Sequence, residues 1–176
     1  MAELEIHHEH GGEHDSFGQR IGVTAALIGI VLAVVTIQSH RSHTEAVILK
    51  ADANDKWAYY QSKSVKRNEY GIAAELAKLS SASEPNIEKV VQRFEKEKDR
   101  YEKETEEIQN EAKHVEDEVH TQEGKALRYD IGEGLLELGL VLCSLYFISK
   151  RKLFPYVGVV SASFGAIISL TAVLVH

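Results

Sequence analysis

SSASEP, residues 80–85, lies between two long segments without proline and predicts the turn of a helical hairpin. A run of serines interrupts regular structure, and proline is favoured at the first position of a new helix. The flanking residues 42–79 and 86–129 are rich in Ala, Glu, Lys and Gln, which favours helix. We therefore expect two long helices joined at residues 80–85.

The second of these segments carries a seven-residue repeat. Its members are Ile87, Phe94, Tyr101, Ile108 and Val115 at one position, and Val91, Lys98, Thr105, Ala112 and Val119 four residues later. A repeat of this kind is typical of a coiled-coil-like seam. Lys98 and Thr105 make the seam imperfect.

The two arms match when they are folded antiparallel about the turn. The predicted pairs, which mostly place a large side chain against a small one, are Gly71 with Phe94, Ala74 with Val91, Ser64 with Tyr101, Trp57 with Ile108 and Ala53 with Ala112. Tyr60 follows Trp57 by about one turn and faces Thr105. We therefore assign Trp57, Tyr60, Phe94, Tyr101 and Ile108 to packing or interaction of the hairpin.

Charges along the arms agree with this pairing. Basic residues lie in the first arm, and acidic residues lie opposite in the second: Lys56, Lys63, Lys66 and Arg67 against Glu102, Glu104, Glu106 and Glu107. A stripe with the chemistry to hold phosphate or an anionic lipid head group is also formed by Lys56, Tyr59, Lys63, Lys66 and Tyr70. A solvated face paired with the acidic arm is the preferred interpretation.

Three apolar runs flank the hairpin and indicate membrane spans: Ile21 to Ile37, Leu135 to Ile148 and Pro155 to Val175. We predict an all-α fold of three transmembrane helices with a long antiparallel, coiled-coil-like hairpin between the first and second spans. The predicted order is a leader (1–19), span one (20–38), the hairpin (39–129), span two (130–149), a basic loop (150–153) and span three (154–175).

The second span begins with an acidic stripe. Asp130, Glu133 and Glu137 recur at spacings of three and four, so they lie along one face of a helix. Ionisable groups at membrane depth usually face a bundle interior or a water-filled cavity, which favours a cation or proton site. Alternatively, the span begins at Leu138 and the three carboxylates are interfacial.

The sequence contains few other candidates for a metal, cofactor or catalytic site. The leader contains His7, His8, His10 and His14 among glutamates, a ligand set that binds divalent transition metals loosely, and we expect no other cofactor. The chain has no phosphate-binding glycine loop and no nucleophile with a base at recognisable spacing, so we predict no enzyme. The net charge of −7 argues against nucleic acid as a partner.

Small residues and basic residues indicate packing and orientation. Ala25, Gly29 and Ala33 recur every four residues in the first span, as do Ser161, Gly165 and Ser169 in the third, which favours close helix packing. The basic loop, residues 150–152, favours a cytoplasmic leader and loop with the hairpin on the opposite side of an inner membrane.

The sequence ANDKWAYYQSKSVK, residues 53–66, carries a family resemblance. With the His-rich leader, one preceding span and two closing spans, it resembles the bacterial membrane protein family called domain of unknown function 4337. The resemblance covers nearly the whole chain. It implies the membrane architecture and carries no activity.

Together these features predict a non-enzymatic, multi-pass membrane protein. We expect the lipid bilayer as one partner, and either further copies or other membrane subunits bound through the hairpin. The alternative is a cation or proton conduit, or a metal-responsive transport component, that uses Glu133, Glu137 and the His-rich leader.

Overall fold

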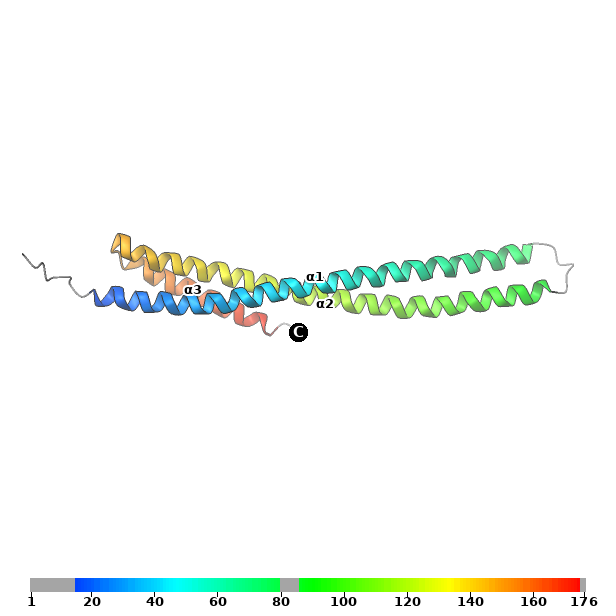
Figure 1. Cartoon of the computed structure of the whole chain (residues 1–176), viewed down its shortest axis with the longest axis horizontal. Coiled ribbons are helices and arrows are strands. Elements are labelled where there is room, and N and C mark those ends of the chain that lie inside the picture. Colours follow the sequence, from blue (N-terminus) through cyan, green and yellow to red (C-terminus); the bar gives the residue numbers. More distant parts are fainter. Residues whose placement is uncertain (1–14, 80–85, 175–176) are drawn as a thin grey trace, which may run out of the picture. The chain divides into compact units, whose positions relative to one another are not determined.

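The computed structural model describes residues 15–79 and 86–174, and these residues form three α-helices and no strand (Figure 1). Helix α1 is Ser16–Leu79, α2 is Ile87–Ser149 and α3 is Leu153–Ala172. The all-α fold and the hairpin are confirmed. Each helix contains a stretch long and apolar enough to cross a membrane, also as predicted. The predicted turn at residues 80–85 lies outside the described residues.

The chain forms two compact units. The apolar unit contains the described residues up to Ser39 and those from Leu127 onward. The hairpin unit contains residues His40–Ala126. Helix α3 belongs to the apolar unit, whereas α1 and α2 contribute residues to both.

A seven-residue repeat in α1 builds the core of the apolar unit. Ile21, Ile28 and Val35 are buried, each seven residues after the last. They form one cluster with buried residues of the other two helices, Leu136, Cys143, Tyr146 and Ala162. A spacing of seven keeps side chains on one face of a helix that crosses its neighbours at a shallow angle.

Glycines bring α2 and α3 into close contact. A Cβ atom on Gly139 would lie 2.6 Å from the carbonyl oxygen of Gly158, and one on Gly165 would lie 2.6 Å from that of Gly132. Only glycine permits backbones to approach this closely. Ser161 adds a hydrogen bond to a backbone carbonyl of α2, at 2.9 Å.

The two predicted small-residue faces have different environments. In α3, Gly165 packs on α2 and Ser169 is buried, as expected for a packing face. In α1, a Cβ atom on Gly29 would meet no atom within 4 Å, and Ala33 is exposed. Close packing is therefore found for α3 but not at Gly29.

The hairpin unit is held by the predicted heptad seam. Every residue of that repeat in the second arm is buried or half-buried except Lys98. Buried seam residues of the first arm are all small, namely Ala46, Ala53 and Ala74, whereas the second arm contributes larger ones, Tyr101, Val115 and Val119. The prediction that large side chains of one arm meet small ones of the other agrees with the structure only in part, because Ala112 of the second arm is also buried and Tyr70 of the first arm packs on Phe94 and Tyr101.

One predicted pair of the two arms is not the contact found in the structure. Gly71 is predicted to face Phe94, but a Cβ atom on Gly71 would lie 3.8 Å from Cδ of Lys98. Phe94 instead packs on Tyr70, which also stacks on Tyr101 with ring centroids 5.6 Å apart. Small residues along the first arm tolerate several offsets, so ring stacking and ion pairs decide among them.

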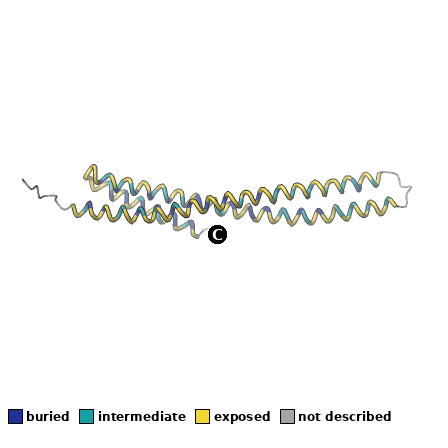
Figure 2. Tube along the Cα trace, viewed as in Figure 1, coloured by how far each residue is buried: buried dark blue, intermediate teal, exposed yellow. Residues whose placement is uncertain are grey.

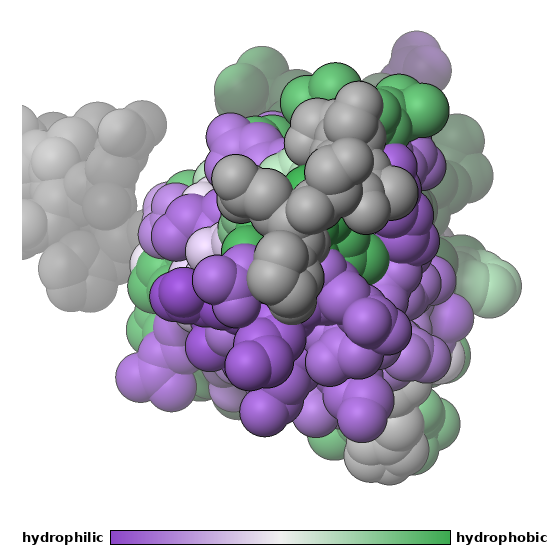
Figure 3. All heavy atoms as spheres, turned by 90° about the vertical axis from the view of Figure 1, so that its right-hand side faces the viewer, coloured by the Kyte–Doolittle hydropathy of each residue, from purple (hydrophilic) through white to green (hydrophobic). Residues whose placement is uncertain are grey.

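Two packed helices cover only one side of each arm. Figure 2 shows buried positions recurring along the helices between longer exposed stretches. Viewed from the end of the hairpin, hydrophilic side chains form most of the coloured foreground, with smaller hydrophobic areas between them (Figure 3). The described part of this end of the molecule is thus mainly hydrophilic, with hydrophobic areas between.

Candidate functional site

Two of the three predicted acidic residues accept hydrogen bonds from hydroxyl groups of α1. Thr36 Oγ1 donates to Glu133 Oε1 at 2.7 Å, and Ser39 Oγ donates to Asp130 Oδ1 at 2.6 Å. Glu137 is exposed. The structure therefore brings Asp130 and Glu133 together with two hydroxyl groups, and it leaves Glu137 apart from them.

We call these two contacts the hydroxyl–carboxylate pairs. They lower the free-energy cost of holding ionised carboxylates in the apolar unit. An ionised carboxylate costs about 2.5–3.5 kcal/mol at the centre of a membrane helix on insertion scales, and less in the first turn of predicted span two, where Asp130 and Glu133 lie. A hydrogen bond to a charged group contributes about 1.5–3 kcal/mol, so the hydroxyl groups offset much of that cost. A carboxylate has several acceptor positions, and one hydroxyl leaves Glu133 capacity to hold a proton or a cation.

The predicted metal ligands lie outside the described residues. They are the leader histidines His7, His8, His10 and His14. Within residues 15–79 and 86–174, no group of three or more His, Cys, Asp or Glu side chains could hold a metal ion. Metal binding by the leader stays a prediction.

Ion pairs join the arms of the hairpin unit, and one of them, Lys63 with Glu104, lies within the predicted charge pattern. Lys56 Nζ lies 3.0 Å from Glu111 Oε2, and Lys63 Nζ lies 2.7 Å from Glu104 Oε2. The hydrogen bond to Glu104 raises the pKa of Lys63, and the same bond lowers the pKa of Glu104. Both groups are therefore charged near neutral pH. Exposed pairs are individually weak, so their main effect is on register.

The predicted packing residues of the hairpin fall into two groups. Phe94, Tyr101 and Ile108 occupy seam positions of α2, and Tyr101 is buried. Trp57 and Tyr60 are half-buried and pack edge to face within α1, with ring centroids 5.5 Å apart. The second group therefore flanks the interior of the hairpin and makes a contact within its own helix.

Three cationic groups surround the Tyr101 ring. Arg100, Lys63 and Lys66 lie 4.7, 5.4 and 5.9 Å from its centroid. Cations over an aromatic face are favourable by about 0.5–1 kcal/mol at exposed sites. Lys63 also binds Glu104, so part of the basic and aromatic stripe serves contacts within the hairpin. These contacts favour the paired-face interpretation of the stripe.

Asp15 is a residue of the apolar unit that has no predicted role. Its carboxylate caps α1 by accepting a hydrogen bond from the Gly18 N–H at 2.8 Å, which lowers the pKa of Asp15. It also accepts hydrogen bonds from the Tyr146 hydroxyl at 3.1 Å and from Lys150 Nζ at 3.4 Å. An aspartate directly before a helical stretch is a signal for the cap, but nothing local indicates the contacts with α2.

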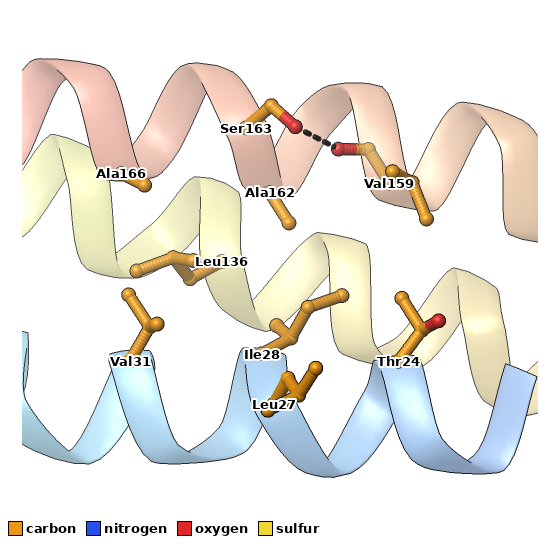
Figure 4. A pocket seen from close by; sticks show the side chains of 9 residues that line it. All are labelled: Thr24, Leu27, Ile28, Val31, Leu136, Val159, Ala162, Ser163 and Ala166. Atoms are coloured by element: carbon orange, nitrogen blue, oxygen red, sulfur yellow. Dashed lines mark hydrogen bonds between the residues drawn. The ribbon is translucent and has the colours of Figure 1, made fainter.

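An apolar groove of about 190 Å³ lies between the three helices of the apolar unit (Figure 4). It is lined by Thr24, Leu27, Ile28, Val31, Leu136, Val159, Ala162, Ser163 and Ala166. The Thr24 hydroxyl donates to the Arg20 carbonyl, and the Ser163 hydroxyl donates to the Val159 carbonyl. Both hydroxyl protons are used within their own helices, so the groove presents mainly hydrocarbon.

Comparison with known proteins gave one family match. The model of the family described as "Domain of unknown function (DUF4337)" matches residues 17–175. The comparisons with curated proteins and with solved structures gave no match.

Proposed function

The chain belongs to the family described as "Domain of unknown function (DUF4337)", and within that family we propose that it is a non-enzymatic assembly component of a membrane. Its hairpin joins copies of the chain, or joins the chain to other membrane subunits. We place the protein in the inner membrane of a bacterial cell. The leader and the basic loop lie in the cytoplasm, and the hairpin lies on the opposite side.

One observation supports this proposal above others. The hairpin unit lies outside the apolar runs, yet it exposes large aliphatic side chains. Val47 is 69% exposed, Ile48 63%, Ile72 59% and Leu76 60%. Large aliphatic side chains exposed at both ends of an otherwise charged arm favour a protein partner.

The mass of the purified complex tests the proposal. The full chain, extracted in mild detergent, is separated by size and its protein mass is measured by light scattering over a range of concentrations. We expect a mass of two or more chains, or a partner that co-purifies in fixed ratio. A single chain at every concentration, without a partner, would count against assembly.

The hydroxyl–carboxylate pairs favour a second candidate function, which is a cation or proton conduit. Glu133 and Asp130 lie one turn apart in α2, and each accepts a hydrogen bond from α1. In an oligomer, copies of this arrangement would form an acidic ring, a common element of cation pathways. The exposed Glu137 extends the same stripe.

Flux measurements in liposomes test the conduit. We expect Glu133→Gln to abolish most of the proton or cation flux, because glutamine cannot exchange a proton. Glu137→Gln serves as the matched control and should have a smaller effect, since Glu137 lies outside the hydroxyl–carboxylate pairs. An absence of flux in the parent protein, or unchanged flux in a variant that carries both Glu133→Gln and Glu137→Gln, would rule the conduit out.

A further inference from the structure

The first arm of the hairpin carries a second seven-residue repeat, and the other arm does not cover it. The members of this second seam are Val47, Ala51, Asn54, Ala58, Gln61, Val65, Asn68, Ile72, Glu75 and Leu79. All of them are exposed. Their spacing alternates between four and three residues, which is the spacing of a coiled-coil seam.

The side of this arm that faces α2 is mixed, because it buries small residues such as Ala53 and Ala74 but only half-buries its larger side chains. The positions that face α2 include half-buried polar and aromatic residues, namely Lys56, Tyr60, Lys63, Arg67 and Tyr70. The second seam instead exposes Val65 by 55%, Ile72 by 59% and Leu79 by 80%. A helix normally turns its most apolar face toward its partner. The second seam is therefore an apolar face of the first arm that no other described helix covers.

The outer face of the second arm differs. Its exposed positions at the same spacing of seven are polar or charged: Lys96, Lys103, Asn110 and Asp117. The second seam is therefore specific to the first arm and is not a general property of the hairpin surface.

We propose that the second seam binds the second seam of another copy of this chain, as a parallel, in-register helix pair. The proposal rests on the assembly function above and identifies its surface and partner. Of the seam residues only Glu75 is charged, so in a parallel pair repulsion is confined to the layer where the two Glu75 side chains meet. A strongly charged partner would find few complementary groups there.

The amide residues of the second seam favour a parallel, symmetric pair. Asn54, Gln61 and Asn68 recur every seven residues and alternate with Ala58 and Val65. An amide both donates and accepts hydrogen bonds, so it can bind its own copy across a two-fold axis. In a parallel pair each layer contains identical positions, and amides meet amides. An antiparallel pair would instead oppose amides with aliphatic side chains.

The dimensions of the second seam suit a second copy anchored in the same membrane. From Val47 to Leu79 it is about 48 Å long and about 10 Å wide, or roughly 480 Å² per copy. Pairing would bury about 1,000 Å², which is below the roughly 1,200–2,000 Å² of stable interfaces and within the range of weak ones. Anchoring both copies in one bilayer raises their local concentration and makes such a contact effective.

Cysteine cross-linking in membranes tests the pairing. Ala51→Cys and Ile72→Cys lie near opposite ends of the second seam, and Lys103→Cys on the second arm is the matched exposed control. The native Cys143 is fully buried and can stay in place. On mild oxidation we expect both seam variants to form covalent dimers of the chain, with the control no higher than the parent. An antiparallel pair would not link either position to itself.

A charge substitution gives a second readout that separates the two proposals. Gln61→Lys should reduce the mass of the oligomer in detergent, and Asn110→Lys on the other arm should not. If the parent is a homo-oligomer but neither seam variant cross-links, the proposed pairing through the second seam is wrong, whereas the assembly function is not contradicted. If the parent instead binds another protein through this face, the second-copy proposal is also wrong. If the parent protein is a monomer without a partner, both the assembly function and the pairing through the second seam are wrong.

Discussion

Replacement of Gly139 by alanine is expected to destabilise the apolar unit by about 1–3 kcal/mol, the usual cost of overpacking. The added Cβ would lie 2.6 Å from the Gly158 carbonyl oxygen and 2.8 Å from Cβ of Ala162. A backbone carbonyl cannot rotate away as a flexible side chain can. Helices α2 and α3 must therefore separate, and the neighbouring contact between Gly132 and Gly165 weakens with them.

Cys143 is a native reporter for this change. It is the only cysteine of the chain, it is fully buried, and it lies against Gly158. Heating the detergent-solubilised protein with a dye that becomes fluorescent on reaction with thiols follows the exposure of Cys143. We expect the midpoint of this transition at a lower temperature in Gly139→Ala than in the parent.

Gly134→Ala is the matched control. A Cβ atom on Gly134 would meet no atom within 4 Å. Exchange of glycine for alanine inside a helix stabilises it by about 1 kcal/mol, so this variant should match or exceed the parent midpoint. Equal midpoints for the two variants would show that α2 and α3 do not pack through Gly139.

Ala112→Leu is expected to destabilise the hairpin unit by a similar amount, about 1–3 kcal/mol. Ala112 is fully buried in the seam, where the first arm contributes the buried Ala53 and Ala46. The larger side chain has no space between arms joined at small residues. It therefore forces the arms apart and weakens the ion pair between Lys56 and Glu111 beside it.

The fluorescence of Trp57 measures the outcome. Trp57 is the only tryptophan, and its half-buried ring packs on Tyr60, so its emission follows unfolding of the hairpin in urea. Asn110→Leu introduces the same side chain at an exposed position two residues earlier and should leave the unfolding midpoint near that of the parent. An Ala112→Leu midpoint equal to the parent would contradict the seam.

Much of the fold follows from periodicity and hydropathy. The heptad from Ile87 to Val119 and the three apolar runs predict the helices correctly, because both signals depend only on spacing along the chain. The register does not follow from them. Small residues such as Ala53 and Ala74 fit opposite several partners, and the offset depends on contacts such as the Tyr70–Tyr101 stack.

At the acidic site, too, the sequence predicts one part of the arrangement and the neighbouring helix decides the rest. The spacing of Asp130 and Glu133 predicts a polar face on α2, but it does not identify their partners on α1. Thr24 and Thr36 lie in the same apolar run, yet Thr24 donates to its own helix and Thr36 donates to Glu133. Either choice is open to a hydroxyl group in a helix, and the neighbouring helix decides between them.

The sequence by itself predicted three apolar helices and a long helical hairpin with a heptad seam on its second arm. These features are read along one helix at a time. Only the tertiary structure decided that Glu133 binds Thr36, that glycines join α2 to α3, and that the second arm leaves the repeat from Val47 to Leu79 uncovered. Such facts depend on which side chains of distant segments meet, and helical spacing carries no information about that.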